Sequence, residues 1–300
     1  MVLKVNNTEG CHGHPSHGKT LTRRYYAVLS IAGSDSSGGA GIQADLKTLS
    51  ALGVYGATAI TAITAQNTEG VHSQFTLPPQ MVYDQIRAVI DDIRPSVIKI
   101  GMLSTAEVAS AVADALTGCS IPIILDPVMV SSSGHRLLSV EAQEVVKQRL
   151  LPMSLLLTPN IPEMEALTRM PLSTLAEREC AARHLLALGA KAVLLKGGHE
   201  EGDIKRDILY QERGNMVTST YLSTPTVYTK NIHGTGCTLS SAIAAYIARG
   251  DKLEEAVARA KEYISKAIEA GADISIGRGF GPVNHLFNPL KMGIYEEYEL

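Results

Sequence analysis

The segment Gly234-Thr235-Gly236-Cys237 has the residue types of an anion-binding helix start, because a run of small residues, 240–245, predicts a helix behind it. The first backbone N–H groups of a helix lack partners within it, and the helix dipole attracts negative charge, so the amides of residues 235–237 could hold a phosphate. A thiol at such a helix start has a lowered pKa and could accept a proton, which neighbouring phosphates would oppose. The alternative interpretation is a capped core helix with Cys237 as a small buried side chain.

A second glycine-rich run, residues 32–41, lies between an expected strand and an expected helix. Gly38, Gly39 and Gly41 would let the backbone adopt left-handed conformations and approach a ligand closely. We expect Asp45 in the first turn of the following helix, with its carboxylate able to face a cleft. The alternative is an ordinary tight turn with Asp45 as a helix-start residue. The run lacks the GxGxxG order of a dinucleotide site, which makes an NAD-dependent oxidoreductase a poor fit.

Residues 13–20, Gly-His-Pro-Ser-His-Gly-Lys-Thr, match the P-loop string without its structural context. No strand precedes the string, and a strand rather than a helix is expected after it, so we do not expect phosphate binding there. The nearby histidines have short, irregular spacing, which favours a solvated segment over a metal site. We interpret residues 1–24 as a mobile N-terminal tail and residues 25–300 as a single domain.

Apolar runs alternate with amphipathic runs along most of the chain, and these elements must position the two glycine-rich loops. The apolar runs predict strands at Ala27–Ile31, Ala57–Ala65, Val97–Ile100, Ile121–Leu125, Leu155–Leu157 and Val193–Leu195. Helical patterns cover Ile42–Leu52, Gln80–Ile93, Ala106–Leu116, Val140–Leu150, Pro162–Thr168, Leu175–Leu188, Cys237–Arg249 and Leu253–Ala270. Antiparallel edge strands are expected at Asp207–Tyr210 and Met216–Leu222.

This alternation predicts an α/β fold with a doubly wound, mostly parallel central sheet and helices on both faces. The strand runs are almost continuously apolar, as expected for a sheet that is covered on both sides. Ligands of such sheets bind beyond the carboxyl ends of the strands, where both glycine-rich loops are expected.

Composition excludes several classes of partner. The 300 residues carry a formal net charge of −3 with 19% charged residues and no Trp, so we expect no nucleic-acid partner. No apolar run approaches the roughly 20 residues needed to span a bilayer, and no membrane partner is expected. The four cysteines are widely spread without CxxC spacing, which favours the reducing cytoplasm over a disulfide framework or a structural zinc site.

Seven motifs, in chain order, strongly resemble those of the hydroxymethylpyrimidine and phosphomethylpyrimidine kinases of thiamine biosynthesis, which belong to the ribokinase-like superfamily. They lie at residues 31–47, 65–68, 99–103, 125–129, 158–163, 195–199 and 233–239, and the match covers roughly residues 25–288. The resemblance implies a ribokinase-like fold, ATP and Mg2+ as cofactors, and an aminopyrimidine substrate. The implied reaction is phosphorylation of 4-amino-5-hydroxymethyl-2-methylpyrimidine and of its monophosphate.

The resemblance also implies which residues surround the pyrimidine. Gln66 matches the family position that binds the ring, and its amide offers one donor and one acceptor side by side. Asp45, Gly33 and Val128 match other positions around the ring. Asp45 could accept from the exocyclic amine, and Val128 could pack on the ring face.

A third group of matching positions belongs to the nucleotide. Asn160 and Glu163 match the family's phosphate and magnesium region, with Glu163 expected to act through the metal or its waters. Asp126 and Lys196 would support the same charge network, or else be ordinary strand-end residues. The segment 234–237 matches the superfamily's anion hole, where most related sugar kinases have an aspartate in place of Cys237.

These assignments lead to one mechanistic hypothesis. The γ-phosphoryl group of ATP would pass in line to the substrate hydroxyl, held by the amides of Thr235, Gly236 and Cys237. Magnesium and Lys196 would offset the charge, and the Cys237 thiol would take the hydroxyl proton late. The alternatives are a pyridoxal or pyridoxamine kinase on the same scaffold and a non-catalytic ligand-binding relative. A homodimer is expected.

Overall fold

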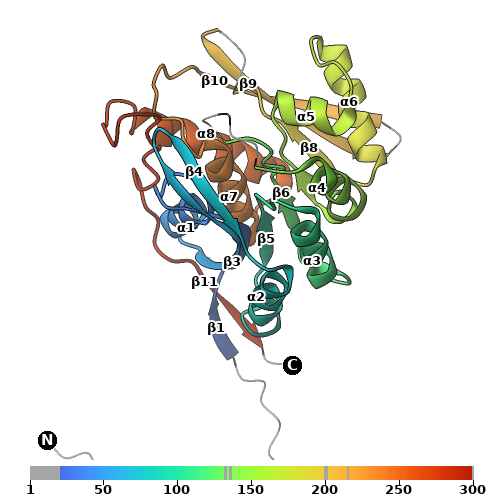
Figure 1. Cartoon of the computed structure of the whole chain (residues 1–300), viewed down its shortest axis with the longest axis vertical. Helices are drawn as coiled ribbons and strands as arrows, with labels where there is room; N and C mark the ends of the chain where they lie inside the picture. Colours follow the sequence, from blue (N-terminus) through green and yellow to red (C-terminus); the bar gives the residue numbers. More distant parts are fainter. Residues whose placement is uncertain (1–20, 132–133, 135–136, 199–201, 215, 299–300) are drawn as a thin grey trace, which may run out of the picture.

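A nine-stranded mixed sheet forms the centre of the protein (Figure 1). The computed structural model describes residues 21–131, 134, 137–198, 202–214 and 216–298. The strands of the sheet are β2 (Ala27–Asp35), β3 (Tyr55–Asn67), β4 (Gly70–Thr76), β5 (Val97–Ile100), β6 (Ile123–Leu125), β7 (Leu156–Leu157), β8 (Ala192–Leu195), β9 (Ile204–Arg213) and β10 (Met216–Pro225).

The strand order is β10-β9-β8-β7-β6-β5-β2-β3-β4. The six strands from β8 to β3 in this order run parallel, whereas β4 pairs antiparallel with β3, and β9 pairs antiparallel with both β8 and β10. The chain moves from β2 to β3 on one side and then returns to β5 on the other side of β2. This reversal creates a switch point at the carboxyl end of β2, where ligands of open α/β sheets bind.

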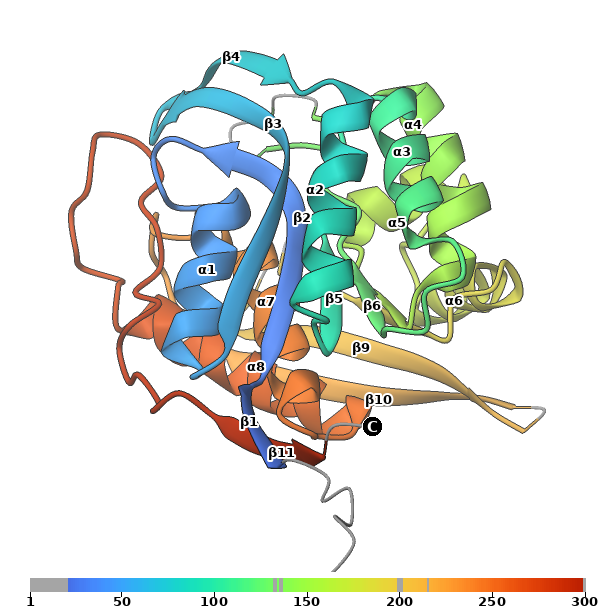
Figure 2. The same ribbon diagram turned by 90° about the horizontal axis from the view of Figure 1, so that it is seen from below.

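Helices cover both faces of the sheet (Figure 2). One face carries α1 (Gly41–Ala51), α7 (Thr235–Ala248) and α8 (Leu253–Glu269). The other carries α2 (Pro79–Asp92), α3 (Ala106–Leu116), α4 (Val140–Val145), α5 (Ile161–Thr168) and α6 (Leu175–Ala187). A π-helical turn, Val146–Leu150, and a 3-10 turn, Leu151–Met153, continue α4.

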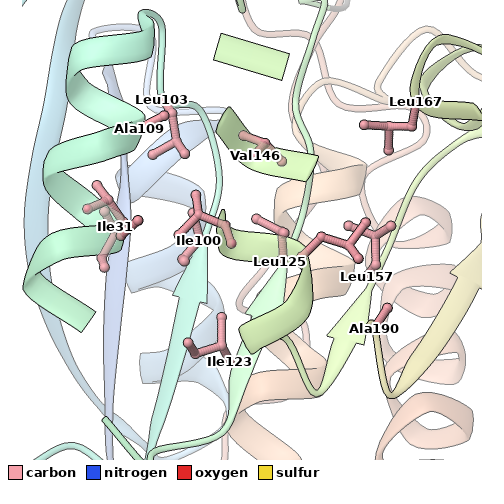
Figure 3. Close-up of a cluster of buried hydrophobic side chains, with 14 of the residues drawn as sticks. Ile31, Ile100, Leu103, Ala109, Ile123, Leu125, Val146, Leu157, Leu167 and Ala190 are labelled. Atoms are coloured by element: carbon pink, nitrogen blue, oxygen red, sulfur yellow. The ribbon is translucent and has the colours of Figure 1, made fainter. Parts of the chain in front are cut away.

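Two buried clusters, one on each face of the sheet, explain why the central strands are almost continuously apolar. Val28 belongs to the cluster under α7 and α8, and its neighbour Leu29 belongs to the cluster under α2 and α3. Figure 3 shows the second cluster, in which Ile100 and Leu125 from adjacent strands meet Val146. The predicted doubly wound α/β fold is therefore confirmed.

An additional antiparallel pair joins the two ends of the described chain. It consists of β1 (Leu21–Tyr25) and β11 (Ile294–Tyr298). Tyr26 stacks on Tyr295 at 5.1 Å between ring centroids, which anchors this pair to the domain. Residues 21–24 therefore form a strand, and the prediction that the tail extends to residue 24 is wrong. The P-loop-like string at 13–20 lies outside the described residues.

The predicted strands and helices correspond to observed elements, and the antiparallel pair β9–β10 also appears where it was expected. Within the described residues, no helix combines the length and the apolar character needed to cross a bilayer.

Candidate active site

The two glycine-rich loops pack directly against each other at the carboxyl ends of the strands. Gly234, at φ +78°, leaves so little room that a Cβ there would lie 1.9 Å from the carbonyl oxygen of Gly39. A Cβ on Gly39 would in turn lie 2.4 Å from Cδ2 of the His233 ring. Both glycines are therefore required by close backbone approach, and the two loops form one site.

Replacing Gly234 by alanine is expected to reduce both stability and turnover, because the new methyl group would force the loops apart. A matched control is Gly118→Ala, since Gly118 has a similar φ of +75° but nothing within 4 Å of its Cβ position. The control should lose stability only through backbone strain, about 1–2 kcal/mol. Thermal unfolding and kinase assays compare the two variants, and equal losses would contradict the packing argument.

The start of α7 presents backbone amides to this site. The first hydrogen bond of the helix ladder runs from the Thr238 N–H to the Gly234 carbonyl, so Gly236 and Cys237 direct N–H groups out of the helix end. The Thr235 N–H donates to the Ile232 carbonyl at 3.3 Å. The expectation of three free amides is therefore wrong for Thr235, and the donor set consists of the two following residues.

The Cys237 thiol is half-buried behind these amides. Burial raises the pKa of Cys237 to about 11, although the Lys99 ammonium acts to lower it. The carboxylates of Asp45 and Asp126 add to the rise. The thiol is therefore protonated at neutral pH, and the lowering expected from a helix start does not dominate.

Three charged side chains meet opposite the start of α7. Asp126 follows β6, Lys196 follows β8, and Glu163 lies in the first turn of α5. The Lys196 Nζ lies 2.7 Å from Asp126 Oδ1 and 3.6 Å from Glu163 Oε2. A Cβ on Gly236 would lie 3.5 Å from the same Nζ, so this cluster faces the helix start.

Burial acts to raise the pKa of Asp126, but the ammonium groups of Lys196 and Lys99 outweigh it and hold that pKa below its ordinary value. Burial likewise acts to lower the pKa of Lys196, and the two carboxylates hold it above its ordinary value. The pKa of Glu163 is raised, mainly by burial and in part by the Asp126 charge. One lysine thus faces two buried carboxylates, and an added cation would favour the ionised form of Glu163.

Asn160 and Glu163 cap the start of α5, in addition to any role in binding a ligand. They form a capping box on α5, in which the Glu163 N–H donates to Asn160 Oδ1 at 2.8 Å and the Asn160 N–H donates to Glu163 Oε2 at 2.7 Å. The spacing of the Asn-Ile-Pro-Glu segment carries this signal in the sequence. The box fixes the orientation of the Glu163 carboxylate toward Lys196.

Asp45 does not face the cleft. It lies in the second turn of α1, and its side chain is fully buried in an ion pair with Lys99 at 2.9 Å. Ser30 Oγ and Ser241 Oγ also donate to its carboxylate, at 2.6 and 2.7 Å. The expectation of a first-turn, cleft-facing carboxylate is therefore wrong, because the same helix face that carries Ile42 and Leu49 is buried under α7.

The three other positions expected around the pyrimidine, Gln66, Val128 and Gly33, differ in how far they are buried. Gln66 is half-buried at the end of β3, and Val128 is half-buried just after β6. Gly33 is buried, and a Cβ there would lie 2.9 Å from the Met102 sulfur. Gln66 adjoins the His233 ring, with its Nε2 atom 3.3 Å from His233 Nε2. The structure thus brings Gln66 to the loop that starts α7.

A groove of about 540 Å³ lies between β10 and α8. Lys261 of α8 lines it and forms an ion pair of 2.8 Å with Asp207. The other Asp207 oxygen accepts from the N–H of Gly197 at 2.9 Å, directly after Lys196. The groove is therefore linked by two contacts to the loop that carries Lys196.

Comparisons with known proteins agree with this geometry. Residues 35–284 match the family model described as phosphomethylpyrimidine kinase. The chain belongs to the phosphomethylpyrimidine kinase family. It is 46% identical to the hydroxymethylpyrimidine/phosphomethylpyrimidine kinase of Salmonella typhimurium, over 86% of this chain and 96% of that protein. It is also 49% identical to the thiamine biosynthesis bifunctional protein ThiED of Geobacter sulfurreducens, over 87% of this chain but only 52% of that protein.

Solved structures of this family and of pyridoxal kinases share the fold. The phosphomethylpyrimidine kinase of Clostridium difficile superposes with a TM-score of 0.70 at 44% identity, covering 81% of this chain and 99% of that one. The pyridoxal kinase of Bacillus subtilis, an ADP complex, gives 0.79 at 35% identity, covering 87% and 97%. The predicted family, the ribokinase-like fold and the enzyme class, a kinase, are confirmed. The backbone alone does not separate the two substrate classes.

Proposed function

We propose that the protein transfers the γ-phosphoryl group of ATP to the hydroxymethyl oxygen of the thiamine-pathway aminopyrimidine, and then phosphorylates the resulting monophosphate. The observation that carries the proposal is the start of α7. There, two outward amides face Lys196, whose Nζ lies 3.5 Å from the Cβ position of Gly236. A helix end opposed by a half-buried lysine is suited to a transferring phosphoryl group.

Positioning and charge neutralisation carry most of the rate of such transfers, because the transition state is loose. The amides of Gly236 and Cys237 hold the oxygens of the transferring group. Lys196 offsets their charge while Asp126 keeps the ammonium in place at 2.7 Å. The Cys237 sulfur follows these amides at the start of α7 and, in its thiolate form, would take the proton of the attacking hydroxyl.

A magnesium ion fits the residues present. Glu163 is buried with a raised pKa, and Asp126 lies on the other side of the same lysine. Among the described residues no group of three or more His, Cys, Asp and Glu side chains could hold a metal alone. Magnesium commonly combines one or two carboxylates with phosphate oxygens and water. We propose that Glu163 and Asp126 hold it there, where it would supply Lewis-acid charge to the nucleotide phosphates.

We further propose that the groove between β10 and α8 takes the nucleoside part of ATP. The proposal is supported by the contacts of Lys261, which lines the groove, with Asp207, and of Asp207 with Gly197, the residue after Lys196. ADP and AMP-PCP complexes of the pyridoxal kinase of Staphylococcus aureus, at 32% identity, support nucleotide binding on this scaffold.

Gln66→Ala is expected to weaken binding of the aminopyrimidine by about 1–3 kcal/mol, the usual size of a lost paired donor and acceptor. The KM for ATP should be unchanged. Titration calorimetry with hydroxymethylpyrimidine measures the effect, and Gln80→Ala on the surface of α2 is the matched control. A variant that binds the pyrimidine as tightly as the unaltered protein would remove Gln66 from the site.

The function is tested by comparing kcat/KM for hydroxymethylpyrimidine and pyridoxal, each with ATP and magnesium. We expect a clear preference for the pyrimidine, and formation of the diphosphate on longer incubation. The similarity to pyridoxal kinases makes pyridoxal the competing substrate. Preference for pyridoxal would replace the proposal, and turnover of neither substrate would favour the non-catalytic alternative.

The homodimer and the cytoplasmic location stay predictions. Sedimentation of the purified chain tests the first, and a single species at monomer mass would contradict it.

A further inference from the structure

A buried hydrogen bond between Asp35 and His233 joins the two glycine-rich loops next to Gln66. The His233 Nε2 lies 2.8 Å from Asp35 Oδ2, and both side chains are almost fully buried. The Asp35 carboxylate also accepts from the backbone N–H groups of Ser37 at 2.8 Å and Ala40 at 2.9 Å. The pair is therefore held from one side by the backbone of the first loop, and its imidazole comes from the second.

The geometry fixes a proton on Nε2 of His233. Burial acts to raise the pKa of Asp35, but hydrogen bonds from His233 and Ser37 outweigh it and hold that pKa below its ordinary value. An ionised carboxylate only accepts hydrogen bonds. Nε2 at 2.8 Å from it must therefore carry hydrogen, whether the ring is neutral or charged.

This proton determines how the Gln66 amide must be oriented. The amide has one terminal atom 3.3 Å from His233 Nε2 and the other 3.2 Å from Thr64 Oγ1. Thr64 Oγ1 donates its single hydrogen to the Ser34 carbonyl oxygen at 3.0 Å. Toward the Gln66 amide, it can therefore only accept a hydrogen bond. The amide oxygen and nitrogen have nearly the same shape, and the hydrogen bonds decide between them. With the amide oxygen toward His233, the Nε2 hydrogen that points to Asp35 Oδ2 is shared with that oxygen, whereas the amide nitrogen there would set two N–H groups against each other. The nitrogen then faces Thr64 and donates to its Oγ1.

We infer that Asp35 and His233 are positioning residues that set the order of donor and acceptor which Gln66 presents to the substrate. This inference rests on the proposed function, because it assumes that Gln66 contacts the pyrimidine. The remaining lone pair of the oxygen accepts from an exocyclic amine, and the remaining N–H donates to the adjacent ring nitrogen. A pyrimidine with a carbonyl in place of that amine reverses both groups and is rejected.

The inference is tested with His233→Met, which removes the donor, and His233→Gln, whose amide nitrogen can replace Nε2. The measurement is kcat/KM for hydroxymethylpyrimidine and for its oxo analogue. We expect His233→Met to raise the KM for the aminopyrimidine about tenfold and to reduce its preference over the oxo analogue by a similar factor. The KM for ATP should stay the same, and His233→Gln should restore most of the preference. An unchanged preference in His233→Met would overturn the inference, since a purely structural role would affect both substrates equally.

A double variant separates action through Gln66 from general damage. In a Gln66→Ala background, His233→Met should have little further effect on binding of the aminopyrimidine, measured by calorimetry without ATP. Full additivity of the two losses would contradict coupling. This measurement needs no turnover, so it also distinguishes the two proposals. If the Gln66→Ala and His233→Met effects on pyrimidine binding are coupled but the protein phosphorylates neither hydroxymethylpyrimidine nor its monophosphate, only the proposed function is refuted.

Discussion

Replacing Lys99 by methionine is expected to lower the free energy of unfolding by about 3–5 kcal/mol, the largest stability effect predicted for this protein. Lys99 and Asp45 are both fully excluded from solvent and lie 2.9 Å apart beneath α7. Removing the ammonium leaves a buried carboxylate without a counter-charge, and Ser30 and Ser241 can only donate hydrogen bonds to it. Chemical denaturation at neutral pH measures the loss.

The pH dependence of this effect follows from the lysine. Burial acts to lower the pKa of Lys99, but the Asp45 carboxylate outweighs it and holds that pKa above its ordinary value. A raised lysine pKa stabilises the fold fully below the unfolded value of 10.5 and less as pH rises through the folded one. The destabilisation by Lys99→Met should therefore be the same at pH 7 and pH 9.

Two further variants control for the substitution itself. Lys147→Met removes a lysine of similar length from an ion pair with Glu144 at 2.9 Å near the surface, and should cost at most about 1 kcal/mol. Asp45→Asn added to Lys99→Met removes the unpaired charge and should recover part of the stability. A double variant no more stable than Lys99→Met would show that packing, rather than charge, dominates at this site.

Local patterns predicted the parallel core of the fold but not the strands that depend on distant partners. The six central strands are apolar at successive positions because both faces are covered, and this is visible in a short window. β4, with the polar residues His72, Ser73 and Gln74, pairs on one side only and lacks that signal. β1 and β11 form a pair across nearly the whole chain, with Arg24 and Glu297 in contact, and no local pattern specifies such a partner.

The candidate site shows the same division. Each glycine-rich loop was predicted separately, whereas the contact between Gly39 and Gly234 depends on the tertiary fold. The prediction that Asp45 faces the cleft was wrong, although its spacing from Ile42 and Leu49 puts it on the buried stripe of α1. This spacing outweighs the preference of carboxylates for helix starts. Lys99, a single charge within a buried strand, carries a comparable signal that a buried partner exists.

Cys237→Ser is expected to lower kcat at least about a hundredfold, the usual contribution of a positioned general base, while leaving the KM for the pyrimidine nearly unchanged. The serine keeps the backbone amide that holds the phosphoryl group and loses only the ionisable sulfur. Cys180→Ser is the matched control, because that cysteine is exposed. Unchanged turnover in Cys237→Ser would remove the thiol from proton transfer and leave catalysis to the amides and Lys196.

The pH dependence of kcat is a second test of Cys237 as the general base. Burial raises the pKa of Cys237 to about 11, so the protonated thiol, which cannot accept a proton, predominates throughout the neutral range. If the thiolate is the base, kcat should rise with pH from 6 to 9, because the fraction of thiolate grows about tenfold per pH unit below its pKa. Lys99 acts to lower that pKa, so Lys99→Met should reduce turnover further at each pH. A flat profile in the unaltered enzyme, with chemistry rate-limiting, would mean that the proton leaves the hydroxyl for a phosphate oxygen instead, and that the fold uses Cys237 for its amide and its fit against Gly41.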